Sequence, residues 1–239
     1  MRILSTITLV ALLAIPSAAT LADGLIYRLP KDGTSVEFEM KESFERNGQK
    51  MESDGTFSMS FAGKETVDGE ACRWIEFKMV MKLGGNVQTI VAKVLVPEKQ
   101  LAAGKHPFSH VKKAWLKQGD REAKELSDDE LSGNDGGPLP AFLAGPFDDA
   151  KTPKSETIDS GLGKLEIKVV TGSTQFKQGL MDNKYTFTNR LNDKAPFGVV
   201  ASEIKFELTQ NDQQVNSGTM TFKLAKVGKD AMKGIPNNK

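Results

Sequence analysis

The stretch SVEFEMKESFERNGQKMESDGTFSMSF, residues 35–61, decides the fold class. Apolar and polar residues alternate through Ser35–Glu45, and the alternation resumes in Lys50–Ala62. A period of two places every second side chain on the same face of a β-strand. Asn47-Gly48 separates the two runs, and this dipeptide favours a tight hairpin because both turn residues need a positive φ. The stretch therefore predicts an antiparallel hairpin with one apolar face.

The same alternation extends through most of the chain. Asp68-Gly69 and Gly84-Gly85 are further turn signals, and residues 87–96 are apolar on both faces, which indicates an interior strand or one covered by a helix. The later apolar rows are Leu165/Ile167/Val169, Tyr185/Phe187/Leu191, Ile204/Phe206/Leu208 and Met220/Phe222/Leu224. We therefore predict about eight antiparallel strands, most of them apolar on one side only.

The segment between the two blocks of strands does not continue this alternation. Ser109–Gly119 predicts a helix with a serine N-cap and a glycine stop, and residues 120–131 predict a second polar helix or a strand and turn. Residues 133–153 are rich in Gly, Pro, Asn and Asp, which indicates a loop or short helix docked on the sheet. Near the start of the chain, Leu25–Leu29 predicts an opening strand.

These few helices constrain the architecture. Eight strands at a spacing of about 4.8 Å make a sheet about 38 Å wide, whereas a helix about 10 Å across covers roughly two strands. The apolar face must therefore be covered by the sheet curling on itself. We predict a mainly β (β-rich α+β) fold, an antiparallel curled sheet or half-barrel of about eight or more strands. A helical lid insertion at about residues 105–153 completes a single domain spanning residues 23–239.

Residues 1–22 have the pattern of a cleavable secretory signal peptide. A basic Arg2 precedes an apolar stretch, and small residues follow it, with equally suitable cleavage positions after Ala19 and Ala22. The apolar stretch is shorter than the roughly 20 residues of a spanning helix, so we expect a secreted or periplasmic protein without a membrane anchor. Cys72 is the one cysteine, and we expect it to be buried, the alternative being a disulfide between chains.

Composition excludes several classes of function. The 239 residues carry a formal charge of +1, so no basic surface for nucleic acid is expected. No phosphate-binding loop or cofactor motif occurs, and we expect no cofactor. His106 and His110 have a spacing that can bind a metal, but no Glu follows His106 directly and the chain has no third histidine. No catalytic residue is assigned, because neither histidine lies in a nucleophile motif.

The candidate binding residues form an unusual apolar row. Strands ordinarily favour β-branched residues, whereas the apolar positions of the first strands are Phe and Met, and Met is flexible and suits varied apolar partners. The candidate cavity lining is Phe38, Met40, Phe57, Met59, Phe61, Phe77, Met79 and Met81, with Trp115 from the lid. This row favours a deformable cavity for an acyl chain or apolar peptide; the alternative is that large side chains fill a wide core.

The order of these elements resembles the periplasmic lipoprotein-localisation carriers: a signal peptide, antiparallel strands, a helical segment at Ser109–Gly119 and further strands. The resemblance implies an open half-barrel under a helical lid that carries lipoprotein acyl chains. This chain departs from it at Leu25–Leu29, where the carriers have a helix, so no site residue is transferred. Ala195–Val200 and Cys72–Ile75 also resemble features of an uncharacterised family of bacterial secreted proteins.

Three hypotheses follow from the sequence. The first is a non-enzymatic protein that binds a lipid or a lipoprotein acyl chain in the concave face of its sheet. The second is a cell-envelope interaction module with a filled core and no ligand cavity. The third is a hydrolase with an unrecognised site, which clustering of a histidine with an acid and a serine would support.

Overall fold

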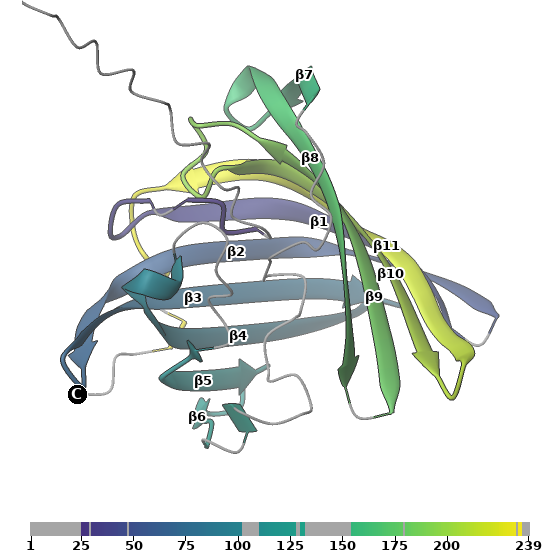
Figure 1. Ribbon diagram of the computed structural model, residues 1–239, viewed down its shortest axis with the longest axis horizontal. Coiled ribbons are helices and arrows are strands. Elements are labelled where there is room, and N and C mark those ends of the chain that lie inside the picture. Colours follow the sequence, from purple (N-terminus) through teal and green to yellow (C-terminus); the bar gives the residue numbers. More distant parts are fainter. Residues whose placement is uncertain are drawn as a thin grey trace, which may run out of the picture.

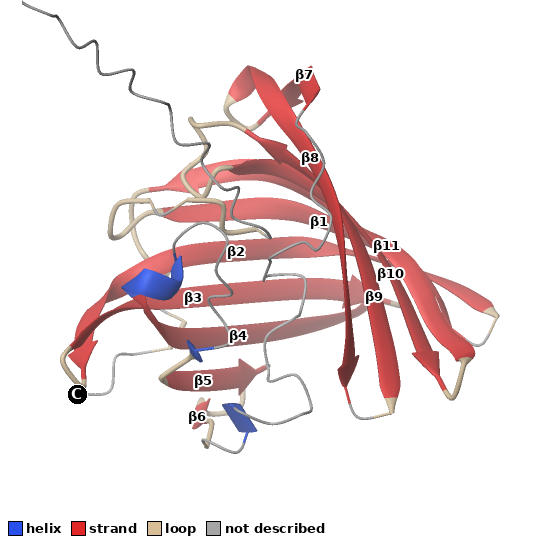
Figure 2. Ribbon diagram, viewed as in Figure 1, coloured by secondary structure: helices blue, strands red, loops and turns tan. Residues whose placement is uncertain are grey.

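In the computed structural model, the described residues form eleven strands of one antiparallel sheet (Figures 1 and 2). The structure describes residues 25–28, 30–46, 48–101, 110–127, 130–131, 154–178, 180–232 and 234–235. The predicted signal peptide, His106 and the predicted loop at 133–153 lie outside the described residues.

The first half of the chain forms β1 (Ser35–Arg46), β2 (Gln49–Val67), β3 (Glu70–Leu83), β4 (Asn86–Pro97), a 3-10 helix η1 (Glu98–Leu101), β5 (Lys113–Gln118) and β6 (Lys124–Glu125). The second half forms β7 (Lys154–Ser160), β8 (Gly163–Gln178), β9 (Met181–Leu191), β10 (Val199–Gln210) and β11 (Gln213–Gly228).

The sheet is curled and unclosed. Its strand order is β6-β5-β4-β3-β2-β1-β11-β10-β9-β8-β7, so each half is a meander and β1 and β11 join the two halves. In Figure 1, β8, β9 and β10 run steeply across the direction of β1–β5. The prediction of a mainly β, curled antiparallel sheet of about eight or more strands is confirmed, with eleven strands among the described residues.

The predicted hairpin turns have the backbone conformation that their residues favour. Asp68 and Gly69 have φ values of 51° and 76°, and Gly84 and Gly85 have values of 55° and 84°. Both residues of each turn thus lie in the left-handed region required by a type I′ turn. These turns set β2 against β3 and β3 against β4.

The predicted helix at Ser109–Gly119 is wrong. Residues 113–118 form β5, which pairs with β4, and residues 110–127 contain no α-helix. The physical reason is alternation: Ala114 enters the main core, whereas Trp115 packs on the opposite face of the sheet. In the described residues, no helical lid is seen.

The opening strand predicted at Leu25–Leu29 is also absent from the described residues 25–28. Leu25 and Ile26 are buried in the core, and the N–H of Tyr27 donates to the carbonyl of Phe197 at 2.9 Å. Residues 25–28 thus form an irregular segment that packs into the core beside Phe197.

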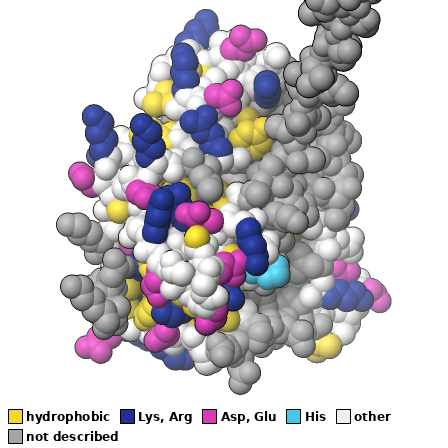
Figure 3. Space-filling model, turned by 60° about the vertical axis from the view of Figure 1, so that its left-hand side comes forward, with side chains coloured by type: hydrophobic (Ala, Val, Ile, Leu, Met, Phe, Trp, Pro, Cys, Tyr) yellow, Lys and Arg dark blue, Asp and Glu magenta, His cyan; other side chains and the backbone are white. Residues whose placement is uncertain are grey.

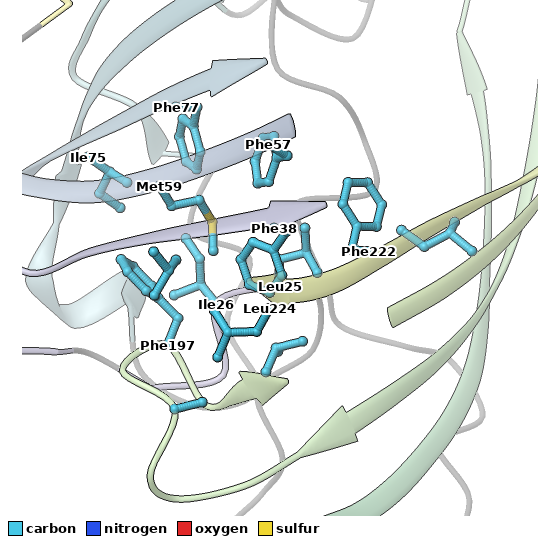
Figure 4. Close-up of a cluster of buried hydrophobic side chains, with 14 of the residues drawn as sticks. Leu25, Ile26, Phe38, Phe57, Met59, Ile75, Phe77, Phe197, Phe222 and Leu224 are labelled. Atoms are coloured by element: carbon cyan, nitrogen blue, oxygen red, sulfur yellow. The ribbon is translucent and has the colours of Figure 1, made fainter. Parts of the chain in front are cut away.

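Two apolar clusters lie on the two faces of the sheet. The larger one joins side chains from β1–β5 to side chains from β8–β11 and defines what we call the inner face. Its members include Phe38, Phe57, Phe77 and Phe222 (Figure 4). The smaller one, Cys72, Trp74 and Leu95, defines the outer face. Cys72 is 1% exposed, as predicted for a core residue.

The C-terminal segment covers part of the outer face. The N–H groups of Gly234 and Ile235 donate to the Glu76 carboxylate, and Lys93 Nζ donates to the carbonyl of Ile235 at 3.0 Å. Residues 91–97 are all buried, and Leu95 packs with Cys72 and Trp74 in the outer cluster. The prediction of an interior strand is confirmed, because β4 lies between β3 and β5. Among the described residues, this C-terminal segment rather than a helix lies over part of its outer face.

Candidate functional site

Eight of the nine predicted lining residues share the inner face. Phe38, Met40, Phe57, Met59, Phe61 and Phe77 are buried in the main cluster, and Met79 and Met81 are partly buried against it. Strand pairing places them in register, with Phe57 opposite both Phe38 and Met79. The structure therefore places these eight side chains on one face, as the alternation in the sequence predicted.

Trp115 does not join this group. Its ring lies on the outer face, with its centroid 5.1 Å from that of Trp74. The Trp74 indole N–H donates to Glu65 at 3.0 Å, and Lys113 binds the same carboxylate at 2.8 Å, which lowers the pKa of Glu65. Trp115 is thus part of a separate structural cluster.

The middle of the inner face is filled by aromatic rings. The Phe57 ring stacks on Phe77 with centroids 6.2 Å apart and meets Phe222 edge-on at 5.7 Å. Phe38 lies 6.5 Å away on the adjacent strand. Figure 4 shows these side chains pointing into one cluster with Leu224. Such contacts are typical of a well-packed core, so this zone presents little free surface.

The apolar surface becomes more open toward one end of the strands. The partly buried side chains that pack on the core there are Phe44, Met79, Met81, Tyr185 and Leu208. Burial raises the pKa of the Tyr185 hydroxyl. Tyr185 and Leu208 belong to the later alternating rows, which lack the richness in Phe and Met on which the predicted lining was based.

A carboxylate also lies on the inner face. Glu42 is half-buried on β1 and follows Phe38 and Met40 at the same period of two. Burial raises its pKa from the usual 4.5. Its neighbour in the β1–β2 register is Ser53, which is 7% exposed. Sequence reasoning missed Glu42, although its position in phase with the apolar row was the available signal.

The structure offers no support for hydrolytic chemistry at His110. This histidine is exposed and lies beside Glu70, Lys99 and Lys112 in a shallow surface pocket. Lys99 binds the Glu70 carboxylate at 2.6 Å and lowers its pKa. Within the described residues, no group of three potential ligands could hold a metal ion.

The surface seen in Figure 3 carries acidic and basic side chains interspersed with one another. This mixture agrees with the nearly balanced composition, and the described residues of that face form no patch of one sign. Among the described residues, no helix is long and apolar enough to span a bilayer.

No family model matches the sequence, and no curated protein matches it. Several solved structures are similar. A DUF1329 family protein from Desulfovibrio piger is 10% identical, with 87% of this chain and 89% of that chain covered and a TM-score of 0.31. A Parabacteroides distasonis protein, provisionally named a lipoprotein, is 10% identical, with coverages of 87% and 99% and a TM-score of 0.34.

A domain from Vibrio parahaemolyticus, provisionally named an outer membrane lipoprotein-sorting protein domain, is 9% identical. It covers 86% of this chain and 88% of its own, with a TM-score of 0.32. All three TM-scores lie below 0.5, so we draw no functional conclusion from these similarities.

Proposed function

We propose that this protein is a secreted or periplasmic, non-enzymatic protein that binds an apolar ligand, a lipid or the acyl chain of a lipoprotein, on the inner face of its sheet. One observation carries the proposal. The inner face is apolar on both halves of an unclosed sheet. At the margin of its buried core lie the partly exposed side chains Phe44, Met79 and Met81. Apolar surface left at the margin of a core favours a ligand that covers it.

The chemistry of these side chains suits an acyl chain. Met79 and Met81 are unbranched, so they can adjust to chains of different length, and Phe44 supplies a rigid wall. Burial of each methylene contributes about 0.8 kcal/mol, so burial of about ten contributes about 8 kcal/mol before the entropic cost of association. A dissociation constant in the micromolar range or weaker is the corresponding expectation.

Ligand binding is tested with the purified chain lacking residues 1–22. Its mixture with the apolar fluorophore N-phenyl-1-naphthylamine should show a rise in emission, and unlabelled dodecanol should displace the fluorophore. Organic extraction followed by mass spectrometry should recover lipid from protein purified without detergent. The absence of both the emission rise and extracted lipid would overturn the proposal and favour an interaction module with a filled core.

A pair of variants locates the binding surface. Met81→Gln places a polar amide on the inner face and should weaken fluorophore binding at least threefold. Val87→Gln makes a similar change at a side chain that is 63% exposed beyond the β3–β4 turn, and should leave binding unaltered. Equal effects of the two substitutions would place the fluorophore elsewhere on the molecule.

A further inference from the structure

The middle strand of the sheet carries an acidic side chain on its apolar side. β1 has five strands on either side in the strand order, and Glu42 follows Val36, Phe38 and Met40 along its inner row. The adjacent strands place Met220 on one side of Glu42 and Ser53 on the other. The described inner-row neighbours of Glu42, which are Met40 and Phe44 along β1, Ser53 on β2 and Met220 on β11, are all uncharged.

Ser53 is the second polar group at this point. It is 7% exposed, and its Oγ is buried without a hydrogen-bond partner. Side chains directly opposite each other on antiparallel strands have Cβ atoms about 4.5–5.5 Å apart, so the hydroxyl and the carboxylate lie on the same small area. A buried hydroxyl without a hydrogen-bond partner lowers the stability of the fold by about 1–3 kcal/mol, and such groups are uncommon in a packed sheet.

The described part of the chain supplies no counter-ion to Glu42. No hydrogen bond or ion pair connects its carboxylate to a described residue, and burial is the cause of its raised pKa. The exposed basic residues of the same hairpin, Lys41 and Lys50, fall on the opposite face of their strands. An ionised carboxylate in such surroundings is best stabilised by a cation that donates hydrogen bonds.

We propose that Glu42 and Ser53 bind the polar end of the apolar ligand, and that this end is a primary ammonium group on a long-chain amphiphile. This inference rests on the proposed function and adds the charge of the ligand to it. The ammonium has three N–H donors and no acceptor, which matches a carboxylate and a hydroxyl that can both accept. A fatty acid would place a second negative charge beside Glu42, which disfavours it.

The apolar part of such a ligand has a surface next to these groups. Met40 and Met220 flank Glu42 directly, and Phe44 follows it along β1. A chain attached to the ammonium could therefore lie on the partly exposed side chains at the margin of the core. The same small area would then supply both the polar and the apolar contacts that an amphiphile needs.

The test compares three ligands of equal chain length, dodecylammonium, dodecanol and dodecanoate, below their micelle concentrations and at low salt. Displacement of N-phenyl-1-naphthylamine gives the three affinities. The unaltered protein should bind dodecylammonium at least tenfold more tightly than dodecanoate. Glu42→Gln should reduce that preference to threefold or less, because it removes the charge and keeps the shape.

Glu39→Gln is the matched control, since it removes the same charge from an exposed position on the same strand and should keep the tenfold preference. Ser53→Ala should weaken dodecylammonium binding about threefold and leave dodecanol binding unchanged.

The outcomes separate this inference from the proposed function. Equal binding of all three ligands, or a preference that survives Glu42→Gln, would overturn the ammonium site while leaving apolar binding in place. Failure of all three to displace the fluorophore or to bind would overturn the proposed function itself.

Discussion

The Glu76 carboxylate accepts a hydrogen bond of 2.9 Å from the backbone N–H of Gly234, which ties the C-terminal segment to the outer face of β3. The N–H of Ile235 donates to the other carboxylate oxygen at 3.2 Å. Glu76 is 0% exposed and lies opposite Lys93 in the β3–β4 register. A buried charge is thus stabilised by two backbone donors and a neighbouring ammonium group.

Loss of this charge should destabilise the fold. Glu76→Gln weakens one charged hydrogen bond and turns an amide N–H toward the second donor, so we expect the free energy of unfolding to fall by about 2–3 kcal/mol. Urea denaturation followed by tryptophan fluorescence measures the change. Glu39→Gln, on an exposed position of β1, should change stability by less than about 0.5 kcal/mol. Similar values for both variants would contradict the structural role of the Glu76–Gly234 contact.

The carboxylate on the inner face should have the opposite effect on stability. Because burial raises the pKa of Glu42 above 4.5, the folded protein holds its proton at pH values where the unfolded chain has released it. The contribution of Glu42 to stability therefore declines as pH rises from about 4.5 through its raised pKa. Glu42→Gln removes this loss and should be more stable than the unaltered protein at neutral pH.

The difference between the two proteins should shrink as the pH is lowered below 4.5, where both side chains are neutral. Urea midpoints measured at neutral and acidic pH test this dependence. A Glu42→Gln variant that is less stable at neutral pH would mean that the carboxylate is held by favourable contacts in the ligand-free protein.

Features of the fold that depend on residues close together in the sequence could be predicted, whereas pairings between distant segments could not. Asp68-Gly69 and the alternating rows on either side are local, so β2, β3 and their shared inner face followed from the sequence. The pairing of β1 with β11 joins residues 35–46 to residues 216–228, and alternation alone does not choose a partner so distant in the chain. The assignment of Ser109–Gly119 to a helix was wrong because a short segment with few apolar residues fits both periods.

The candidate site was partly predictable for the same reason. Met79 and Met81 lie where their strand period placed them, whereas Trp115 was assigned to the inner face on the basis of the wrong helix. Glu42 was in phase with Met40 and could have been recognised by its parity. The contact between Glu76 and the C-terminal segment carried no signal, because backbone N–H groups are common to every sequence.

Burial should make the Cys72 thiol unreactive. The side chain is 1% exposed against Trp74 and Leu95, and burial is the largest cause of its raised pKa. Only the thiolate attacks a disulfide reagent, so both access and ionisation are reduced. We expect the native protein to react with 5,5′-dithiobis(2-nitrobenzoate) at least 100-fold more slowly than the protein in 8 M urea. Rapid reaction of the native protein would instead support a thiol available for pairing between chains.

Two glycines should differ sharply in their tolerance of a methyl group. A Cβ at Gly55 would lie 1.8 Å from the backbone oxygen of Val80 on the adjacent strand, so the sheet itself would have to move. A Cβ at Gly234 would meet the side-chain atoms Val91 Cγ1 at 2.9 Å and Glu76 Oε1 at 3.0 Å, which can shift. We expect Gly55→Ala to lower the free energy of unfolding by about 3 kcal/mol and Gly234→Ala by about 1 kcal/mol. Thermal and urea unfolding of the two variants measure this order. If Gly234→Ala is the less stable variant, the C-terminal contact contributes more to the free energy of unfolding than the close approach of β2 and β3.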